Sequence, residues 1–415
     1  MAFDESRAPH ARYKWEVLAI LWVAFFLNQA DRQIFNVVLP LIRDDLKLTD
    51  ADMGFIAMAF TVVFALLVPV AGYVGDTFSR KWICTFSVLF WSLATMVTGW
   101  STGVVTLILF RSIAMGGGEA LFAPANYAML AGYHRETRSL ALALQQTSVY
   151  IGVIASGYAA GYIGEHYGWT YAFYLFGGAG VLLGGVMAAR LKDPPPEPDE
   201  QAAANQNSSL RETAGILLKN PTAILLTAAF AGLISFVIGY LTWMPTLLHE
   251  KFHLSLADAG FASMFYVHVP AFIGVVITGR FTDRCVARRT DARLLLQLGG
   301  MLGCAPFLWL MGRAGTLPGC YLALAGFGLF RGVYEANTYA ALYDVVPVRF
   351  RASAAAMMIT FGFLTGALSP FLLGYLKPTL GLSAGVSWLA APALFAATAV
   401  FLAWRRSPWQ TGQRP

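Results

Sequence analysis

The stretch GYVGDTFSRK at residues 72–81 is echoed half a chain later by GRFTDRCVARR at residues 279–289. Each copy follows a long apolar run and places an aspartate, then a basic pair, where the chain would leave a membrane. A weaker echo, HRETRSLA at 134–141 and VRFRASA at 348–354, has the same register. Two echoes in register predict a duplicated chain, and a repeated loop of this kind is typical of transporters.

The composition is that of a membrane protein. Of the 415 residues, 57% are hydrophobic and 13% are charged, about half of the ~25% charged residues found in soluble domains. Mean hydropathy is +0.58. Apolar runs recur along the chain at about the length needed to cross ~30 Å of hydrocarbon as a helix. We therefore predict an all-α polytopic membrane protein, with the lipid bilayer as its surroundings.

Breaks in these runs indicate twelve candidate spans. The first lacks the cleavage-site pattern of a signal peptide, so we expect it to remain in the protein. The expected spans are 15–40, 53–75, 82–101, 103–127, 139–163, 170–190, 221–248, 259–281, 293–312, 318–342, 352–376 and 383–404.

A polar, proline-rich segment at 192–209 cannot span a membrane or pack a core, so we interpret it as a linker. It predicts an N-terminal six-helix bundle at 1–190, a cytoplasmic linker at 191–220 and a C-terminal six-helix bundle at 221–415. The two copies of the repeated loop then follow the second span of each bundle.

Charge placement predicts the orientation of the chain. With both termini in the cytoplasm, most of the 29 lysines and arginines lie on the inner side, whereas four aspartates at positions 44, 45, 50 and 52 lie outside. This distribution follows the positive-inside rule. It also accounts for the net charge of +6, so no nucleic acid partner is expected. We expect a protein of a bacterial inner membrane.

The repeated loop resembles the signature of the major facilitator superfamily, Gly-x-x-x-Asp-x-x-x-Arg-Lys. Two positions depart from it, since Thr77 replaces the usual basic residue and Ser79 the usual glycine. In the second copy the basic pair lies one residue further from Asp283. The resemblance implies twelve transmembrane helices in two bundles, with spans 1, 4, 7 and 10 lining a central cavity and alternating access as the mechanism.

Two other segments resemble particular branches of that superfamily. NQADR at 28–32 and GGGEALFAP at 116–124 are similar to the anion:cation symporters, which carry sugar acids and other organic anions, and to the Spinster-type carriers, which are associated with lipids. In both branches an arginine usually lies seven residues before the span 4 glutamate. Arg111 lies eight before Glu119, so no role is carried over to it.

Ionisable residues inside spans are costly and each needs an explanation. Ion pairs that only fix helix packing are one explanation, but packing alone rarely needs so many, which favours function. The residues are Asp31 and Arg32 in span 1, Arg111 and Glu119 in span 4, His268 in span 8, and Arg331 and Glu335 in span 10.

Arg32 and Arg331 lie in different halves, and a guanidinium matches the geometry of a carboxylate or phosphate. We expect both to bind an anionic substrate. Alternatively, Arg331 forms an ion pair with Glu335, which lies four residues on and therefore on the same helix face. The two roles could alternate, with Glu335 releasing Arg331 when substrate arrives.

Asp31 and Glu119 are the best candidates for proton coupling, because a carboxylate in a low-dielectric span can load and unload protons near neutrality. The symporter resemblance supports both positions. Glu335 and His268 are further candidates, although a lone histidine in an apolar span is more often hydrogen-bonded and structural. Arg111 is about two helical turns from Glu119, too far for direct contact.

Amides, phenols and an indole in several spans suit a substrate that bears hydroxyl groups. Ordinary hydrogen bonding between helices explains any one of them at least as well. The expected lining residues are Gln145, Gln146, Tyr150, Trp243, Tyr266, Tyr334 and Asn337.

Asp76, Arg80, Asp283 and Arg288 lie at the expected cytoplasmic rim. Charge pairs there between the two halves would stabilise the outward-open state and would break on inward opening. We therefore expect these four residues to act in gating.

The function expected is proton-coupled symport of a small organic anion, such as a sugar acid or similar carboxylate, by a monomer. A Spinster-like carrier of lysolipid is the alternative, and a receptor that binds without transport has no signalling domain to support it. An enzyme is not expected, because nucleotide loops, nucleophile triads and metal clusters are missing. No cofactor or metal is expected. The four cysteines, Cys84, Cys285, Cys304 and Cys320, are scattered and predict neither a zinc site nor a disulfide.

Overall fold

The protein is described by a computed structural model that covers residues 7–134, 136–194, 210–286 and 291–406. Nearly all of this part of the chain is helical. The helices are α1 (Arg7–Asp45), α2 (Asp50–Thr77), α3 (Arg80–Thr98), α4 (Val104–Leu107), the π-helix η1 (Ile108–Met115), α5 (Gly116–Tyr133), α6 (Arg138–Tyr167), α7 (Trp169–Arg190), α9 (Leu210–Lys219), α10 (Pro221–Phe252), α11 (Leu256–Val286), α12 (Ala292–Arg313), α13 (Leu317–Glu335), α14 (Thr338–Val345), the 3₁₀ turn η2 (Val348–Phe350), α15 (Arg351–Gly366), α16 (Leu368–Leu380), α17 (Leu382–Trp388) and α18 (Ala390–Arg406).

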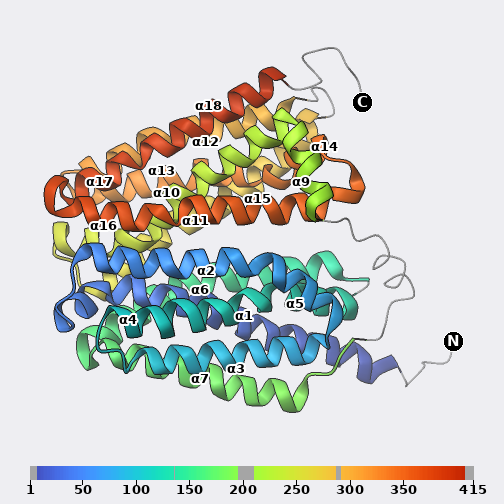
Figure 1. Ribbon diagram of the computed structural model, residues 1–415, viewed down its shortest axis with the longest axis horizontal. Helices are drawn as coiled ribbons and strands as arrows, with labels where there is room; N and C mark the ends of the chain where they lie inside the picture. The colour runs from blue at the N-terminus through green and yellow to red at the C-terminus, as the bar shows by residue number, and fades with distance from the viewer. Residues whose placement is uncertain (1–6, 135, 195–209, 287–290, 407–415) are drawn as a thin grey trace.

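The helices form two bundles that lie side by side (Figure 1). Helices α1–α7 make one bundle, called here the N-half, and α10–α18 make the other, the C-half. The halves meet where α2 packs on α15 and α16, where α6 packs on α11, and where α1 packs on α10. The start of α1 and the end of α18 lie at the same end of the molecule (Figure 1). The arrangement agrees with the two bundles expected from the duplicated loop.

Ten helical stretches of the described residues are long and apolar enough to cross a membrane. The other two expected spans, 15–40 and 318–342, coincide with α1 and with α13 plus α14. Both contain buried charged residues, among them Asp31 and Arg331. Their crossing of the membrane, and hence the count of twelve, stays a prediction.

Several helices begin at N-cap residues that the local sequence supplies. The side chain of Asn220 accepts hydrogen bonds from the backbone N–H groups of Thr222 and Ala223, and Pro221 occupies the first turn of α10. Thr316 caps α13 in the same way, again ahead of a proline. These caps satisfy N–H groups that a helix leaves unpaired at its start.

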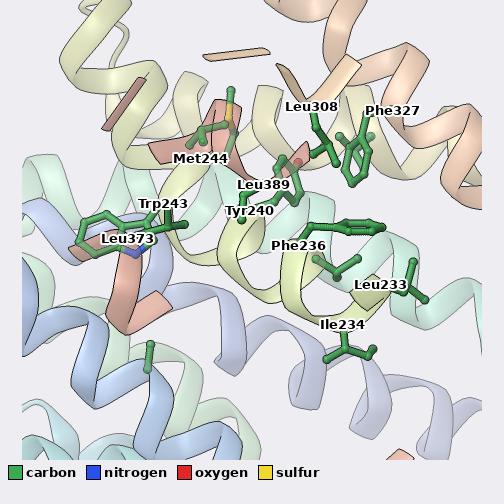
Figure 2. Packing of buried hydrophobic residues seen from close by; sticks show 14 of the residues in the cluster. Leu233, Ile234, Phe236, Tyr240, Trp243, Met244, Leu308, Phe327, Leu373 and Leu389 are labelled. Carbon is green, nitrogen blue, oxygen red and sulfur yellow. The ribbon is translucent and has the colours of Figure 1, made fainter. Parts of the chain in front are cut away.

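The core of the C-half is built from aromatic side chains of α10. Phe236 and Tyr240 point toward Phe327 of α13 (Figure 2), with ring centroids 5.8 and 5.4 Å from the Phe327 ring. Trp243, one to two turns further along, is fully buried and donates a hydrogen bond from Nε1 to the carbonyl of Pro370 at 2.9 Å. One face of α10 is therefore committed to packing within its own half.

Glycines allow the closest helix contacts. A Cβ at Gly328 of α13 would overlap the backbone carbonyl of Val267 in α11, whereas a Cβ at Gly185 of α7 would meet nothing. Small residues at such crossings let helix backbones approach within a membrane protein.

We predict that Gly328→Ala lowers the thermal unfolding midpoint of the purified protein, whereas Gly185→Ala leaves it unchanged. The added methyl at position 328 has only backbone to displace, and overpacking of this kind costs about 1–3 kcal/mol. A fluorescence melting curve in detergent measures the effect. Equal midpoints for the two variants would contradict the contact.

Candidate functional site

A cavity of about 330 Å³ lies between the two halves. Its walls come from α1, α2, η1 and α6 in the N-half and from α10, α11, α13 and α15 in the C-half. Spans 1, 4, 7 and 10, which the family resemblance places at a cavity, all contribute. Volumes of this size accommodate small molecules.

Arg32 of α1 forms the central ion pair of the N-half. Its Nε lies 2.5 Å from Oε2 of Glu119 in α5, whose side chain is fully buried. The guanidinium also lies over the ring of Phe64, 4.4 Å from the centroid. Arg32 lines the cavity but Glu119 does not, so the carboxylate contacts the guanidinium on the side away from the cavity.

Arg111 is a second cation on the same wall. It is buried, lines the cavity and lies between the rings of Phe35 and Phe60, at 5.0 and 4.2 Å from their centroids. Within the described part of the chain, its Nε and Nη1 have no hydrogen-bond partner. Two buried donors on a permanent cation favour a bound anion.

The position of Arg111 depends on the π-helix η1. A π-helix takes one more residue per hydrogen-bonded turn than an α-helix, so the side chains of η1 point in directions that a regular α-helix would not give them. Arg111 lines the cavity, as Arg32 does. The sequence left open whether Arg111 lines the cavity.

On the C-half, Arg331 and Glu335 pair within α13. The Arg331 Nε lies 2.8 Å from Glu335 Oε1, as their four-residue spacing allows, and both residues line the cavity. Among the described residues, Nη1 of Arg331 finds no partner. The alternative pairing expected from the sequence is therefore present, and one donor remains for a ligand.

His268 of α11 also faces the cavity. Its Nδ1 donates to the backbone carbonyl of Met264 at 2.9 Å, which leaves Nε2 as an acceptor. The ring of Tyr150, from α6 of the other half, meets it edge-on at 6.2 Å. A histidine held in this way is suited to accept a hydrogen bond, and its part in proton coupling stays a prediction.

Asp31 lies behind the cavity wall, fully buried. Within the described part of the chain, neither carboxylate oxygen has a hydrogen-bond partner, and Trp91, Thr95, Glu119 and Arg111 lie near it.

Of the expected lining residues, Gln146 and Tyr150 do line the cavity. The structure places five others elsewhere, each occupied by packing or by a hydrogen bond within its own half: Gln145 donates to the Leu21 carbonyl, Trp243 to that of Pro370 and Asn337 to Thr282, Tyr266 stacks on Tyr321, and Tyr334 is buried in the core.

The gating residues expected at the rim fall largely outside the described residues. This holds for Arg288 and for the side chains of Asp76 and Asp283. Arg80 begins α3. The preceding Ser79 donates to Asp193 at 2.5 Å, which holds the start of the linker segment against this loop.

A cluster of four charged residues, not assigned a role from the sequence, joins the halves at the end remote from both termini. We call this the joined end. Arg43 (α1) contacts Asp50 (α2) and Glu250 (α10), each at 3.0 Å, and Lys377 (α16) contacts the same two acids at 3.0 and 2.8 Å. Burial opposes the charge on Arg43, but hydrogen bonds to Asp44, Asp50 and Glu250 outweigh it and raise its pKa.

Residues 21–370 match the Major Facilitator Superfamily, and the chain belongs to that family. It is 30% identical to protein spinster homolog 1 of Xenopus tropicalis over 88% of this chain and 73% of that protein. It is 24% identical to the probable galactarate/D-glucarate transporter GudP of Bacillus subtilis, over 89% and 86% of the two chains.

Among solved structures, the fold matches a bacterial homolog of the human lysosomal transporter Spinster in an inward-facing, unoccupied conformation. The TM-score is 0.84 at 18% identity, over 97% of this chain and 98% of that one. The protein is thus an integral membrane transporter of the superfamily and not an enzyme.

We predict that Glu250→Gln shifts the halves toward separation at the joined end, because it removes the charge shared by Arg43 and Lys377. Partly exposed pairs contribute about 1 kcal/mol, so about a fivefold population change is expected. Electron–electron distances between spin labels at Tyr167→Cys and Thr379→Cys, in a background without native cysteines, report it.

The control is Asp44→Asn, since Asp44 contacts Arg43 within α1 and does not reach the other half. A distance distribution that Glu250→Gln leaves unchanged would contradict a gating role for the cluster.

Proposed function

We propose that this protein is a proton-coupled symporter of a small organic anion, a carboxylate or sugar acid, working by alternating access. The observation that carries the proposal is Arg111, a buried cation on the cavity wall with two donors that have no partner among the described residues. Arg32 and Arg331 reach the same cavity from opposite halves. Three guanidinium groups around a cavity of this size favour one anionic group at their centre.

Anion binding would couple to the proton through Arg32. In the structure, Glu119 occupies its Nε. A substrate carboxylate that binds this guanidinium would deprive Glu119 of its hydrogen-bond partner. For the buried Glu119, taking up a proton would then cost less free energy than staying ionised. Asp31, buried next to Glu119, is the second carrier in this proposal.

Alternating access would use the two halves as the moving bodies, with 191–220 as their linker and one chain as the working unit. The ion pairs at the joined end close one side. Asp76, Arg80, Asp283 and Arg288 would close the cytoplasmic side in the other state. The inward-facing relative supports this assignment, as does the enrichment of lysine and arginine at the terminal end.

A Spinster-like carrier of an amphipathic lipid is the second candidate. It is supported by the 30% identity to a spinster homolog and by the apolar residues of α10 in the cavity. A lysolipid would need a lateral path for its acyl chain to the bilayer. Transport of lysolipid with no effect of carboxylates would favour this candidate over the first.

We predict that Arg32→Gln and Arg111→Gln each weaken carboxylate binding by about 100-fold, because each removes charge-assisted hydrogen bonds from the anion. A panel of carboxylates, including glucuronate, is screened by the rise in thermal unfolding midpoint. Arg313→Gln, which removes a positive charge at the exposed end of α12, is the control. Unchanged shifts in both cavity variants would overturn the anion site.

We predict that a pH gradient, acidic outside, drives uptake into proteoliposomes and that Asp31→Asn and Glu119→Gln abolish accumulation. Both variants carry a permanently neutral group, so exchange of substrate across the membrane should persist. Uptake of labelled substrate with and without a proton uncoupler measures this. Accumulation that the uncoupler does not affect would exclude proton coupling.

A further inference from the structure

Two helices, each the first of its half, present residues to the cavity at the same spacing. On α1 these are Gln29, Arg32, Gln33 and Asn36, and on α10 they are Ile234, Val237, Ile238 and Leu241. Each set follows the i, i+3, i+4, i+7 pattern of one helical face, and the two helices pack together. We call these sets the α1 stripe and the α10 stripe.

The α1 stripe is polar throughout. Gln33 accepts a hydrogen bond from Asn36 at 3.2 Å, and Gln29 donates to Asn28 at 2.9 Å. With Arg32 between them, these amides give the stripe donors and acceptors as well as one positive charge. Arg111 extends the positive wall next to it.

The α10 stripe is apolar throughout. The other face of α10 packs into the C-half core through Phe236 and Tyr240 (Figure 2), so the stripe is what α10 offers to a ligand. Phe363 of α15 continues the apolar wall, and its ring lies 5.6 Å from that of Phe64. Thr242 of α10 also lines the cavity, but its hydroxyl donates to the carbonyl of Ile238 at 2.9 Å. Trp243, the lining residue expected from α10, does not face the cavity.

We infer that the substrate is an amphipathic organic anion, with its carboxylate against Arg32 and Arg111 and an apolar body against the α10 stripe. This inference rests on the proposed anion transport and narrows its substrate class. Burying the apolar body of the substrate against this wall removes apolar surface from water and so lowers the free energy of binding. Hydroxyl groups pressed on the same wall would lose their hydrogen bonds to water without replacement.

Two anions built on six-membered rings distinguish a substrate with an apolar body from one that carries hydroxyl groups. Cyclohexanecarboxylate and glucuronate each carry one carboxylate, but only glucuronate carries hydroxyl groups. Isothermal titration of the full-length protein in nanodiscs gives both dissociation constants. We expect cyclohexanecarboxylate to bind at least about tenfold more tightly, since a polar group without a partner costs that much in a pocket.

The Val237→Thr/Ile238→Thr double variant should reduce this preference about fivefold or more, because hydroxyls on the stripe give glucuronate partners. Val237→Thr alone preserves volume and is the variant of choice if the double variant folds poorly. Val186→Thr, on the exposed face of α7, is the matched control and should retain the wild-type ratio.

Equal or tighter binding of glucuronate by the wild type, or a ratio that the stripe variants leave unchanged, would overturn the inference. If both anions bind in an Arg32-dependent way without apolar preference, the proposed anion transport stands and only this inference fails. If neither anion binds, both fail.

Discussion

The ion pair between Arg32 and Glu119 is the contact on which the cavity depends. It ties α1 to α5 inside the N-half and holds a guanidinium at the cavity wall with 2.5 Å between Nε and Oε2. Glu119 is buried, so loss of Arg32 removes its hydrogen bond and leaves only the more distant charge of Arg111 to compensate it. Under the proposed symport, an anion that enters the cavity would compete with a carboxylate of the protein, and this competition would link substrate binding to proton binding.

The two halves are both helical bundles, but they bring different surfaces to the cavity. The first helix of the N-half brings amides and an arginine to the cavity, and its counterpart α10 brings isoleucine, valine, leucine and one threonine whose hydroxyl bonds to its own helix. The C-half contributes its charge from α13, where Arg331 is already paired with Glu335. The stronger electrostatic anchor is therefore in the N-half, and the C-half supplies mainly shape and apolar contact.

Much of this was predictable from the sequence. The repeated loop predicted two bundles, and charges in expected spans 1 and 10 predicted Arg32 and Arg331 at a cavity. The face that each apolar helix turns inward was not predictable, because a helix that is apolar all round has no polar stripe to orient it. Trp243 and Tyr266 were misplaced for that reason. Arg111 was named as a candidate, but whether it lines the cavity was left open, because its direction depends on a π-helix, which composition does not reveal.

The ion pairs at the joined end hold the two halves together weakly enough for the contact to be reversible. Its ion pairs are partly exposed, so each contributes about 1 kcal/mol or less. Close backbone contacts such as Gly157 of α6 on Gly260 of α11 add packing, but they bury no charge. A transporter needs two states that differ by only a few kcal/mol, so that substrate and proton can decide between them. Weak, solvent-reachable pairs at the rim meet this need, whereas the buried Arg32–Glu119 pair can remain intact until an anion replaces it.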